Sequence, residues 1–248
     1  MKEPRHLNHA PLREALIDIR FDKLIALEKV RAFAAANASG YEKGKDIWQT
    51  SFGIRFDESQ NSTAQSENIV VGLRLDSTSP PHVAQFLVNG FTFSRLHPYD
   101  SWQSLRDAGL GLWKLFSAQE GIETVTRIAL RYINELKLPL PIRDFGDFLT
   151  VPPQVPANLP QGLSGFLQRV VIVNKPSNST AIVTQALEDA PAPGYPPSAT
   201  VVLDIDVFRT DQLGIPVANL PAVLEELHQF KNEIFFEYVT EKALEMFA

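Results

Sequence analysis

Arginines that recur on the predicted polar faces of several strands are the residues best suited to chemistry in this sequence. A guanidinium group can donate two parallel hydrogen bonds to a phosphate or a carboxylate. If the strands are neighbours in one sheet, these side chains form a band on the face away from the helices. The band comprises Arg20, Arg55, Arg74, Arg127 and Arg131. This pattern predicts a site for an anionic small molecule.

Two arginines of this band lie on one predicted strand, and their spacing limits what they can bind together. Arg127 and Arg131 are four residues apart, so they share a face and lie about 13 Å apart along the strand. A compact ligand would therefore contact only one of them. Arg131 is the better candidate, because Tyr132 and Asn134 follow it and would add hydrogen-bond donors.

Acidic residues on the same kind of strand face offer a structural alternative. Opposite charges on neighbouring strands pair readily. The candidates for such pairs are Asp18, Glu135, Asp204 and Asp206. The sequence leaves open whether the arginines bind a ligand or form cross-strand ion pairs.

Asp204 and Asp206 are also weak candidates for a metal site. They project to the same side of their predicted strand and could hold a hard cation such as Mg2+. Strand residues that face solvent produce the same pattern, so we expect no resident metal. Alternating charges would also suit a barrel that holds a triphosphate. The first strand lacks the Glu-x-Glu-x-Lys opening of such enzymes, so this interpretation is only the runner-up.

Other catalytic or cofactor motifs are missing from the sequence. The absence of cysteine removes thiol nucleophiles, disulfides, zinc ribbons and iron–sulfur clusters together. The five histidines have no metal-ligand spacing, and Gly109-Leu110-Gly111 falls inside a predicted helix, where close packing explains it better than phosphate binding. We therefore predict no cofactor and lean against an enzyme.

Charge and hydropathy restrict the location and the partners. A net charge of -6 disfavours a nucleic-acid partner. No apolar stretch reaches the roughly 18 residues of a membrane span, and residues 1–12 lack the apolar core of a secretion signal. These features predict a soluble, cytoplasmic protein that does not bind membranes.

The first half of the chain alternates strands with two helices. A strand is predicted over 15–21, with Ile17, Ile19 and Phe21 facing the core, and a helix over 24–38. Extended stretches follow at 47–56, 69–75 and 82–96, and the polar stretch 59–66 is predicted to be a loop. Asn89-Gly90 indicates a hairpin turn. A second helix starts after Pro98, capped by Asp100 or Ser101, and a long strand covers 124–138.

The second half begins with a segment rich in proline, which cannot be regular helix or sheet. Six prolines lie between residues 139 and 160. Strands are predicted at 166–174, 180–187 and 200–208, followed by one helix over 219–247, roughly 40 Å long. The last helix carries an apolar stripe of Leu220, Leu224, Leu227, Ile234, Tyr238 and Leu244.

This order of elements predicts the fold class. Short turns between most strands, without regular βαβ alternation, indicate an α+β fold with a large antiparallel sheet and about three helices on one face. The first half is ferredoxin-like, with an extra hairpin. We expect a single domain over residues 1–248, with a seam at 139–160 if the chain divides.

Four segments resemble an uncharacterised, sporadically distributed bacterial family of proteins of about this length. They are residues 8–15, residues 93–102, the strand Thr126–Asn134, and residues 231–241. The Arg131-Tyr132-Ile133-Asn134 stretch is the most specific of them. The resemblance implies one full-length bacterial domain, and it implies no activity and no catalytic residues.

Two functional hypotheses follow. The first is a non-catalytic binding or protein-interaction module, whose sheet face is covered by a partner protein or by a second copy in a homodimer. The second is an enzyme or sensor for a phosphorylated small molecule bound on the arginine-rich face. Convergence of the arginines on a pocket would favour the second hypothesis, and cross-strand ion pairs would favour the first.

Overall fold

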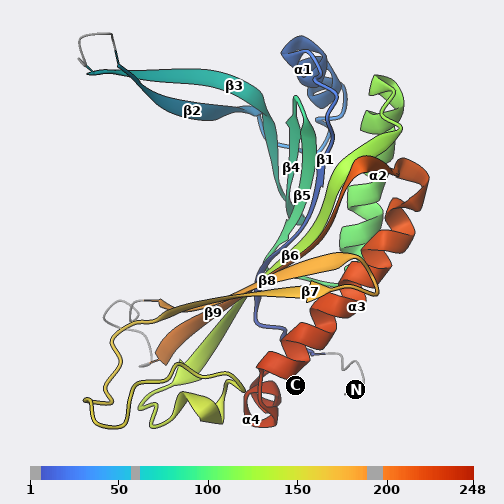
Figure 1. Ribbon diagram of the computed structural model, residues 1–248. Coiled ribbons are helices and arrows are strands. Elements are labelled where there is room, and N and C mark those ends of the chain that lie inside the picture. Colours follow the sequence, from blue (N-terminus) through green and yellow to red (C-terminus); the bar gives the residue numbers. More distant parts are fainter. Residues whose placement is uncertain (1–6, 57–61, 189–197) are drawn as a thin grey trace.

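The described residues form one antiparallel sheet of nine strands with four helices packed against it (Figure 1). This computed structural model describes residues 7–56, 62–188 and 198–248. The strands are β1 (Leu12–Arg20), β2 (Lys45–Phe56), β3 (Ser62–Thr78), β4 (Pro81–Leu87), β5 (Gly90–Leu96), β6 (Thr124–Pro139), β7 (Leu167–Asn174), β8 (Ser179–Glu188) and β9 (Ser198–Pro216). The helices are α1 (Leu27–Ala36), α2 (Trp102–Glu120), α3 (Leu220–Tyr238) and α4 (Glu241–Leu244). The predicted α+β class is confirmed.

The strand order is β2-β3-β4-β5-β1-β6-β9-β8-β7. Within it, β4, β5, β1 and β6 have the order of a ferredoxin-like unit, with α1 leading towards β4 and α2 connecting β5 to β6. The hairpin of β2 and β3 is inserted between α1 and β4. The ferredoxin-like first half with an extra hairpin is therefore present as predicted.

Alternation along β1 explains how the core forms. Ala15, Ile17 and Ile19 are fully buried on the side of the helices. A Cβ atom built on Gly109 of α2 would lie 3.2 Å from Ile17 Cδ1, so glycine lets this helix approach the sheet closely. Ser101 caps α2 by accepting a hydrogen bond from the Ser104 backbone N–H. The close packing at Gly109 and the candidate cap are confirmed.

The first helix is shorter than predicted. It begins at Leu27 and ends at Ala36, and its buried face consists of Val30, Phe33 and Ala34. The backbone N–H of Ile25 donates to Val88 O (2.8 Å), which holds the chain before the helix against the turn between β4 and β5. Leu24 is therefore outside the helix and 76% exposed.

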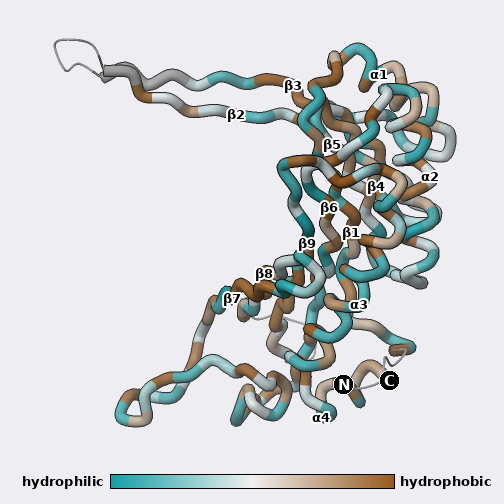
Figure 2. The backbone as a smooth tube through the Cα atoms, turned by 45° about the vertical axis from the view of Figure 1, so that its right-hand side comes forward, coloured by the Kyte–Doolittle hydropathy of each residue, from teal (hydrophilic) through white to brown (hydrophobic). Residues whose placement is uncertain are grey.

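Strands β2 and β3 form a two-stranded arm that projects from the rest of the sheet (Figure 2). We call residues 47–56 with 62–70 the β2–β3 arm. The loop predicted over 59–66 is wrong in its second part, because β3 begins at Ser62; residues 57–61 lie outside the described part of the chain. Trp48, Phe52 and Ile54 of the arm are exposed, with Phe52 at 84%. Their alternation predicted a strand, but no helix of the described chain covers them.

β7 and β8 match the strands predicted at 166–174 and 180–187, whereas β9 continues to Pro216, beyond the predicted end at 208. β9 joins the second half to the first half. β9 pairs with β6 along most of its length and with β8 on its other side. The sheet is thus continuous across the proline-rich segment. The predicted turn at 191–197 lies outside the described residues, and single-domain behaviour remains a prediction.

The single helix predicted over 219–247 is wrong. α3 ends at Tyr238, which makes it about 28 Å long. Val239 is extended and forms a bridge with Leu149, and the Thr240 backbone N–H donates to Phe148 O (3.1 Å). Thr240 then caps α4 by accepting from the Ala243 N–H. Residues Phe148 and Leu149 of the proline-rich segment therefore interrupt the helix, because they pair with the backbone of Val239 and Thr240.

The two ends of the described chain lie together. The His9 backbone N–H donates to Phe247 O at 3.1 Å. In the part of the chain that the structure describes, no helix has the length and apolar character needed to cross a membrane.

Candidate functional site

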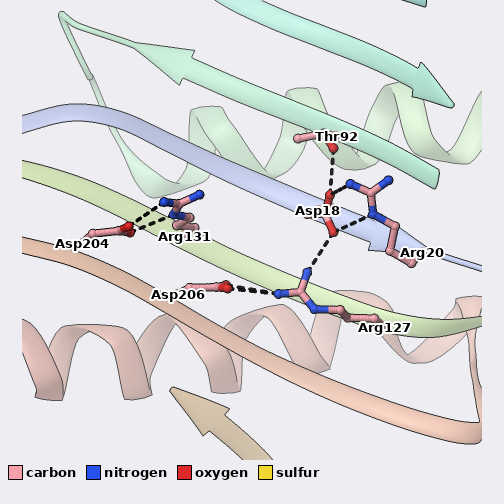
Figure 3. Close-up of polar contacts among 7 residues, drawn as sticks. All are labelled: Asp18, Arg20, Thr92, Arg127, Arg131, Asp204 and Asp206. Carbon is pink, nitrogen blue, oxygen red and sulfur yellow. Dashed lines mark hydrogen bonds and ion pairs between the residues drawn. The ribbon is translucent and has the colours of Figure 1, made fainter. Parts of the chain in front are cut away.

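The described members of the predicted arginine band lie on the sheet face opposite the helices and pair with aspartates, as Figure 3 shows for Arg20, Arg127 and Arg131. Arg127 donates to Asp18 (2.8 Å) and to Asp206 (3.1 Å), so it links β1 to β9 through β6. Arg20 donates to Asp18 with two nitrogens (3.1 and 2.5 Å). Asp18 also accepts from the Thr92 hydroxyl at 2.8 Å. These residues form a connected network across four strands.

Arg131 forms a separate pair beside this network. Its Nε and a terminal nitrogen donate to the two carboxylate oxygens of Asp204, at 2.8 and 2.5 Å. This hydrogen bonding by Asp204 raises the pKa of the Arg131 guanidinium above its ordinary value. The prediction that Tyr132 and Asn134 assist Arg131 is wrong, because both are buried on the helix side of β6.

Arg74, the other described arginine of the band, pairs within its own strand. Arg74 donates to Asp76 of its own strand at 2.8 Å, and its hydrogen bond holds the pKa of Asp76 below the ordinary value. Arg55 belongs to β2, but its side chain lies outside the described residues. The four described arginines thus share a face as predicted, and each is paired with a carboxylate. An anion site there remains a prediction.

Asp204 and Asp206, the weak metal candidates, each bind an arginine. Burial raises the pKa of Asp206, and the charge of Arg127 opposes that rise. Within the described residues, no group of three or more His, Asp or Glu side chains is arranged to hold a metal ion. Asp206 therefore belongs to the Arg127 network, and Asp204 belongs to the separate pair with Arg131.

A cavity on the other side of the sheet is lined by a group of polar side chains that the sequence patterns did not predict as a site. It encloses about 310 Å3 between the chain before β1, the start of α2, strand β6 and helix α3. The apolar part of its lining includes Leu12, Trp102 and Phe235, and the polar part includes Tyr99, Tyr132, Asn134, His228, Lys231 and Asn232. The volume is at the lower end of that of small-molecule sites.

Lys231 is the central polar residue of this cavity. It is only 7% exposed, and no carboxylate of the described residues lies within 4.0 Å of its amine. The Nζ atom donates to Asn232 Oδ1 (2.5 Å) and lies 3.8 Å from the centre of the Tyr132 ring. Burial lowers the pKa of Lys231 to about 7. A buried amine that lacks a counter-charge is an unusual feature of a protein interior.

A chain of hydrogen bonds leads from Lys231 to His228. Because Asn232 Oδ1 accepts from Lys231, its Nδ2 group faces His228 Nε2, at 3.1 Å. The ring stacks on Trp102 (centroids 4.4 Å apart), and burial lowers the pKa of His228 to about 4. The ring is thus neutral, and the proton lies on Nδ1. That buried N–H has no hydrogen-bond partner among the described residues.

Two tyrosines complete the polar wall. The hydroxyls of Tyr99 and Tyr132 are 2.9 Å apart, and their rings meet edge to face. Burial raises the pKa of Tyr99 to about 12 and also raises the pKa of Tyr132. Both groups therefore stay neutral near pH 7 and can donate or accept hydrogen bonds.

The cavity unites parts of the chain that are far apart in sequence. All four segments that carry the family resemblance contribute to its lining, through residues such as Pro11, Trp102, Asn134 and Phe235. A signal for Lys231 was present as well. It occupies the position between Leu227 and Ile234 in the apolar stripe of α3, where a helix normally buries an aliphatic residue.

No protein-family model matches the chain, and no curated protein is significantly similar to it.

Proposed function

We propose that this protein is a binding module whose ligand is a small molecule held in the cavity around Lys231. The observation that carries the proposal is the buried amine of Lys231, which lines a cavity and has no carboxylate partner among the described residues. Burying an unpaired charge is costly, so a protein that retains one gains from a ligand that satisfies it.

The rest of the lining supports the same proposal. The Tyr99–Tyr132 pair offers a hydroxyl hydrogen in addition to the Lys231 amine. Trp102 and Phe235 supply apolar surface. A few convergent donors beside an apolar wall are typical of sites that orient an amphipathic molecule.

Thermal shift with a panel of small amphipathic acids, amides and alcohols tests this function. We expect at least one class to raise the melting temperature of the wild type and to have no effect on Lys231→Met. Lys114→Met, which removes an exposed lysine from α2, is the matched control and should respond like the wild type. A panel without any effect on the wild type would refute the proposal.

A protein-interaction role is the second candidate, and the β2–β3 arm favours it. Trp48, Phe52 and Ile54 expose large apolar side chains on one face of the arm. Such side chains are more typical of interfaces than of solvated surfaces. The arm would bind a partner protein or a second copy of the chain.

The arginine face supports a phosphorylated ligand less well. The described arginines of the band already donate to aspartates, so a phosphate would have to compete with a carboxylate for each of them. We also propose membership of the bacterial family that the sequence resembles, which is supported by the convergence of its four segments on one cavity.

A further inference from the structure

We infer that the ligand of the Lys231 cavity carries a single carboxylate on an apolar body, and that this ligand binds together with a proton taken up at Lys231. The inference rests on the proposed function and adds to it the chemical class of the ligand and the dependence of binding on pH.

The donors around the cavity define the head group. Lys231 directs one N–H to Asn232 and another side of its amine to the Tyr132 ring, which leaves further donor capacity on the same nitrogen. A tyrosine hydroxyl of the Tyr99–Tyr132 pair is a second donor. A planar carboxylate accepts several hydrogen bonds and also supplies the missing negative charge.

None of the described titratable groups around Lys231 supplies this negative charge to the amine, so the ligand has to supply it. Tyr132 on β6 and Tyr99 before α2 are neutral, and His228 on α3 is neutral. Asp100 lies at the cavity, but its carboxylate accepts from the Ser101 N–H at the start of α2.

The remaining acid near His228 is also engaged. Glu225 accepts from Trp102 Nε1 (3.1 Å) and from Arg106 (2.5 Å). Neither this carboxylate nor that of Asp100 forms an ion pair with Lys231 within 4.0 Å.

Proton uptake follows from linkage between the two equilibria. Without ligand, the Lys231 amine is about half protonated at pH 7, because burial lowers its pKa to about 7. A bound carboxylate favours the ammonium form and raises that pKa. Binding at pH 7 should therefore take up about half a proton, and binding at pH 8.5 should take up close to one.

Isothermal titration calorimetry in buffers of different ionisation enthalpy measures this uptake directly. The probes are benzoate, 4-phenylbutanoate and octanoate, each compared with its neutral amide. We expect an acid to bind at least tenfold more tightly than its amide at pH 6.5, and its affinity to fall about tenfold per pH unit above neutrality.

Variants separate the lysine from the rest of the cavity. Lys231→Met should lose the preference for acids, whereas Lys231→Arg, which stays charged, should keep the preference without proton uptake. Lys114→Met is again the control. If both Lys231 variants fail to fold, the proton uptake measured for the wild type alone decides whether the inference stands.

The outcomes distinguish the two proposals. If amides bind as tightly as acids, or if acids bind without proton uptake, this inference is overturned while the cavity remains a binding site. If neither acids nor amides bind the wild type, both proposals are overturned.

Discussion

Arg127 and Arg131 lie on the same face of β6, yet their surroundings differ in a way that should show in stability. Arg127 is 27% exposed, binds both Asp18 and Asp206, and places its guanidinium carbon 4.8 Å from the centre of the Phe208 ring. Arg131 is 43% exposed and binds Asp204 alone. Solvent screens the second pair more strongly.

We therefore predict that Arg127→Ala costs about 1.5–3 kcal/mol in the free energy of unfolding, whereas Arg131→Ala costs less than about 1 kcal/mol. Urea unfolding at pH 7 measures both. Without Arg127 the pKa of Asp206 should rise further. The loss of unfolding free energy in Arg127→Ala should therefore become smaller at lower pH, where Asp206 becomes protonated.

The arginine mutants also test the phosphorylated-ligand hypothesis. If inorganic phosphate stabilises the wild type and not Arg131→Ala, this face is an anion site. Equal costs for the two mutants would contradict the ranking by burial.

The low pKa of Lys231 predicts an unusual pH dependence of stability. The unfolded chain binds a proton at lysine up to about pH 10.4, but the folded state releases it near pH 7. Stability should therefore rise with pH above 7, by about 3 kcal/mol up to pH 9.5. Urea unfolding of wild type and Lys231→Met between these pH values tests this prediction. The mutant should lack the rise, and equal slopes would mean that Lys231 is not buried as an amine.

At the residue scale, the sequence predicted which side of the sheet a residue faces better than it predicted which residues form a binding site. Alternation placed Arg20, Arg127 and Arg131 on the open side of the sheet and also identified Asp18 as a partner. The position of Lys231 in the apolar stripe of α3 is a signal for burial, but it does not establish burial, because a charged residue on a helix usually faces solvent and tertiary packing against Tyr132 encloses this one.

At the scale of elements, α3 holds the second half of the sheet in place through its buried stripe. Leu220, Leu224 and Leu227 are fully buried against the sheet. The sequence predicted this stripe correctly but extended the helix too far. The helical spacing of apolar residues continues past Tyr238. The helix nevertheless ends there, because Val239 forms a bridge with Leu149, which lies far away in sequence.

We predict that Leu227→Ala destabilises the protein by about 2–5 kcal/mol, because it leaves a cavity in a region that cannot fully collapse. Leu115→Ala is the matched control, since Leu115 is an exposed leucine in the middle of α2. Its effect should stay within about 0.5 kcal/mol. Similar losses for both variants, measured by urea unfolding, would contradict the assigned packing of α3.

At the scale of the whole molecule, the β2–β3 arm is the part least explained by the protein's own core. Its two strands pair along their described length, with an irregularity between Ile47 and Trp48, but the apolar face with Trp48 and Phe52 has no covering element in the described structure. The sequence predicted the strands and could not reveal this exposure, because a strand that faces a partner has the same alternation as one that faces a core.

We predict that Phe52→Ser lowers self-association or partner binding and leaves the melting temperature nearly unchanged, because Phe52 contributes little to the folded monomer. Light scattering after size exclusion measures association, and a thermal melt measures stability. A large fall in melting temperature would mean that the arm packs on the body of the protein.

The hydrogen bond between His9 and Phe247 has a consequence for chain connectivity. Ends that meet can be joined by a short linker, and the chain can be opened elsewhere without breaking a strand. Gly162 suits the new opening, since it lies in the exposed connection between β6 and β7. A circular permutant that begins at Leu163 would exchange the order of the two halves and should still fold around the same ladder of β6 and β9.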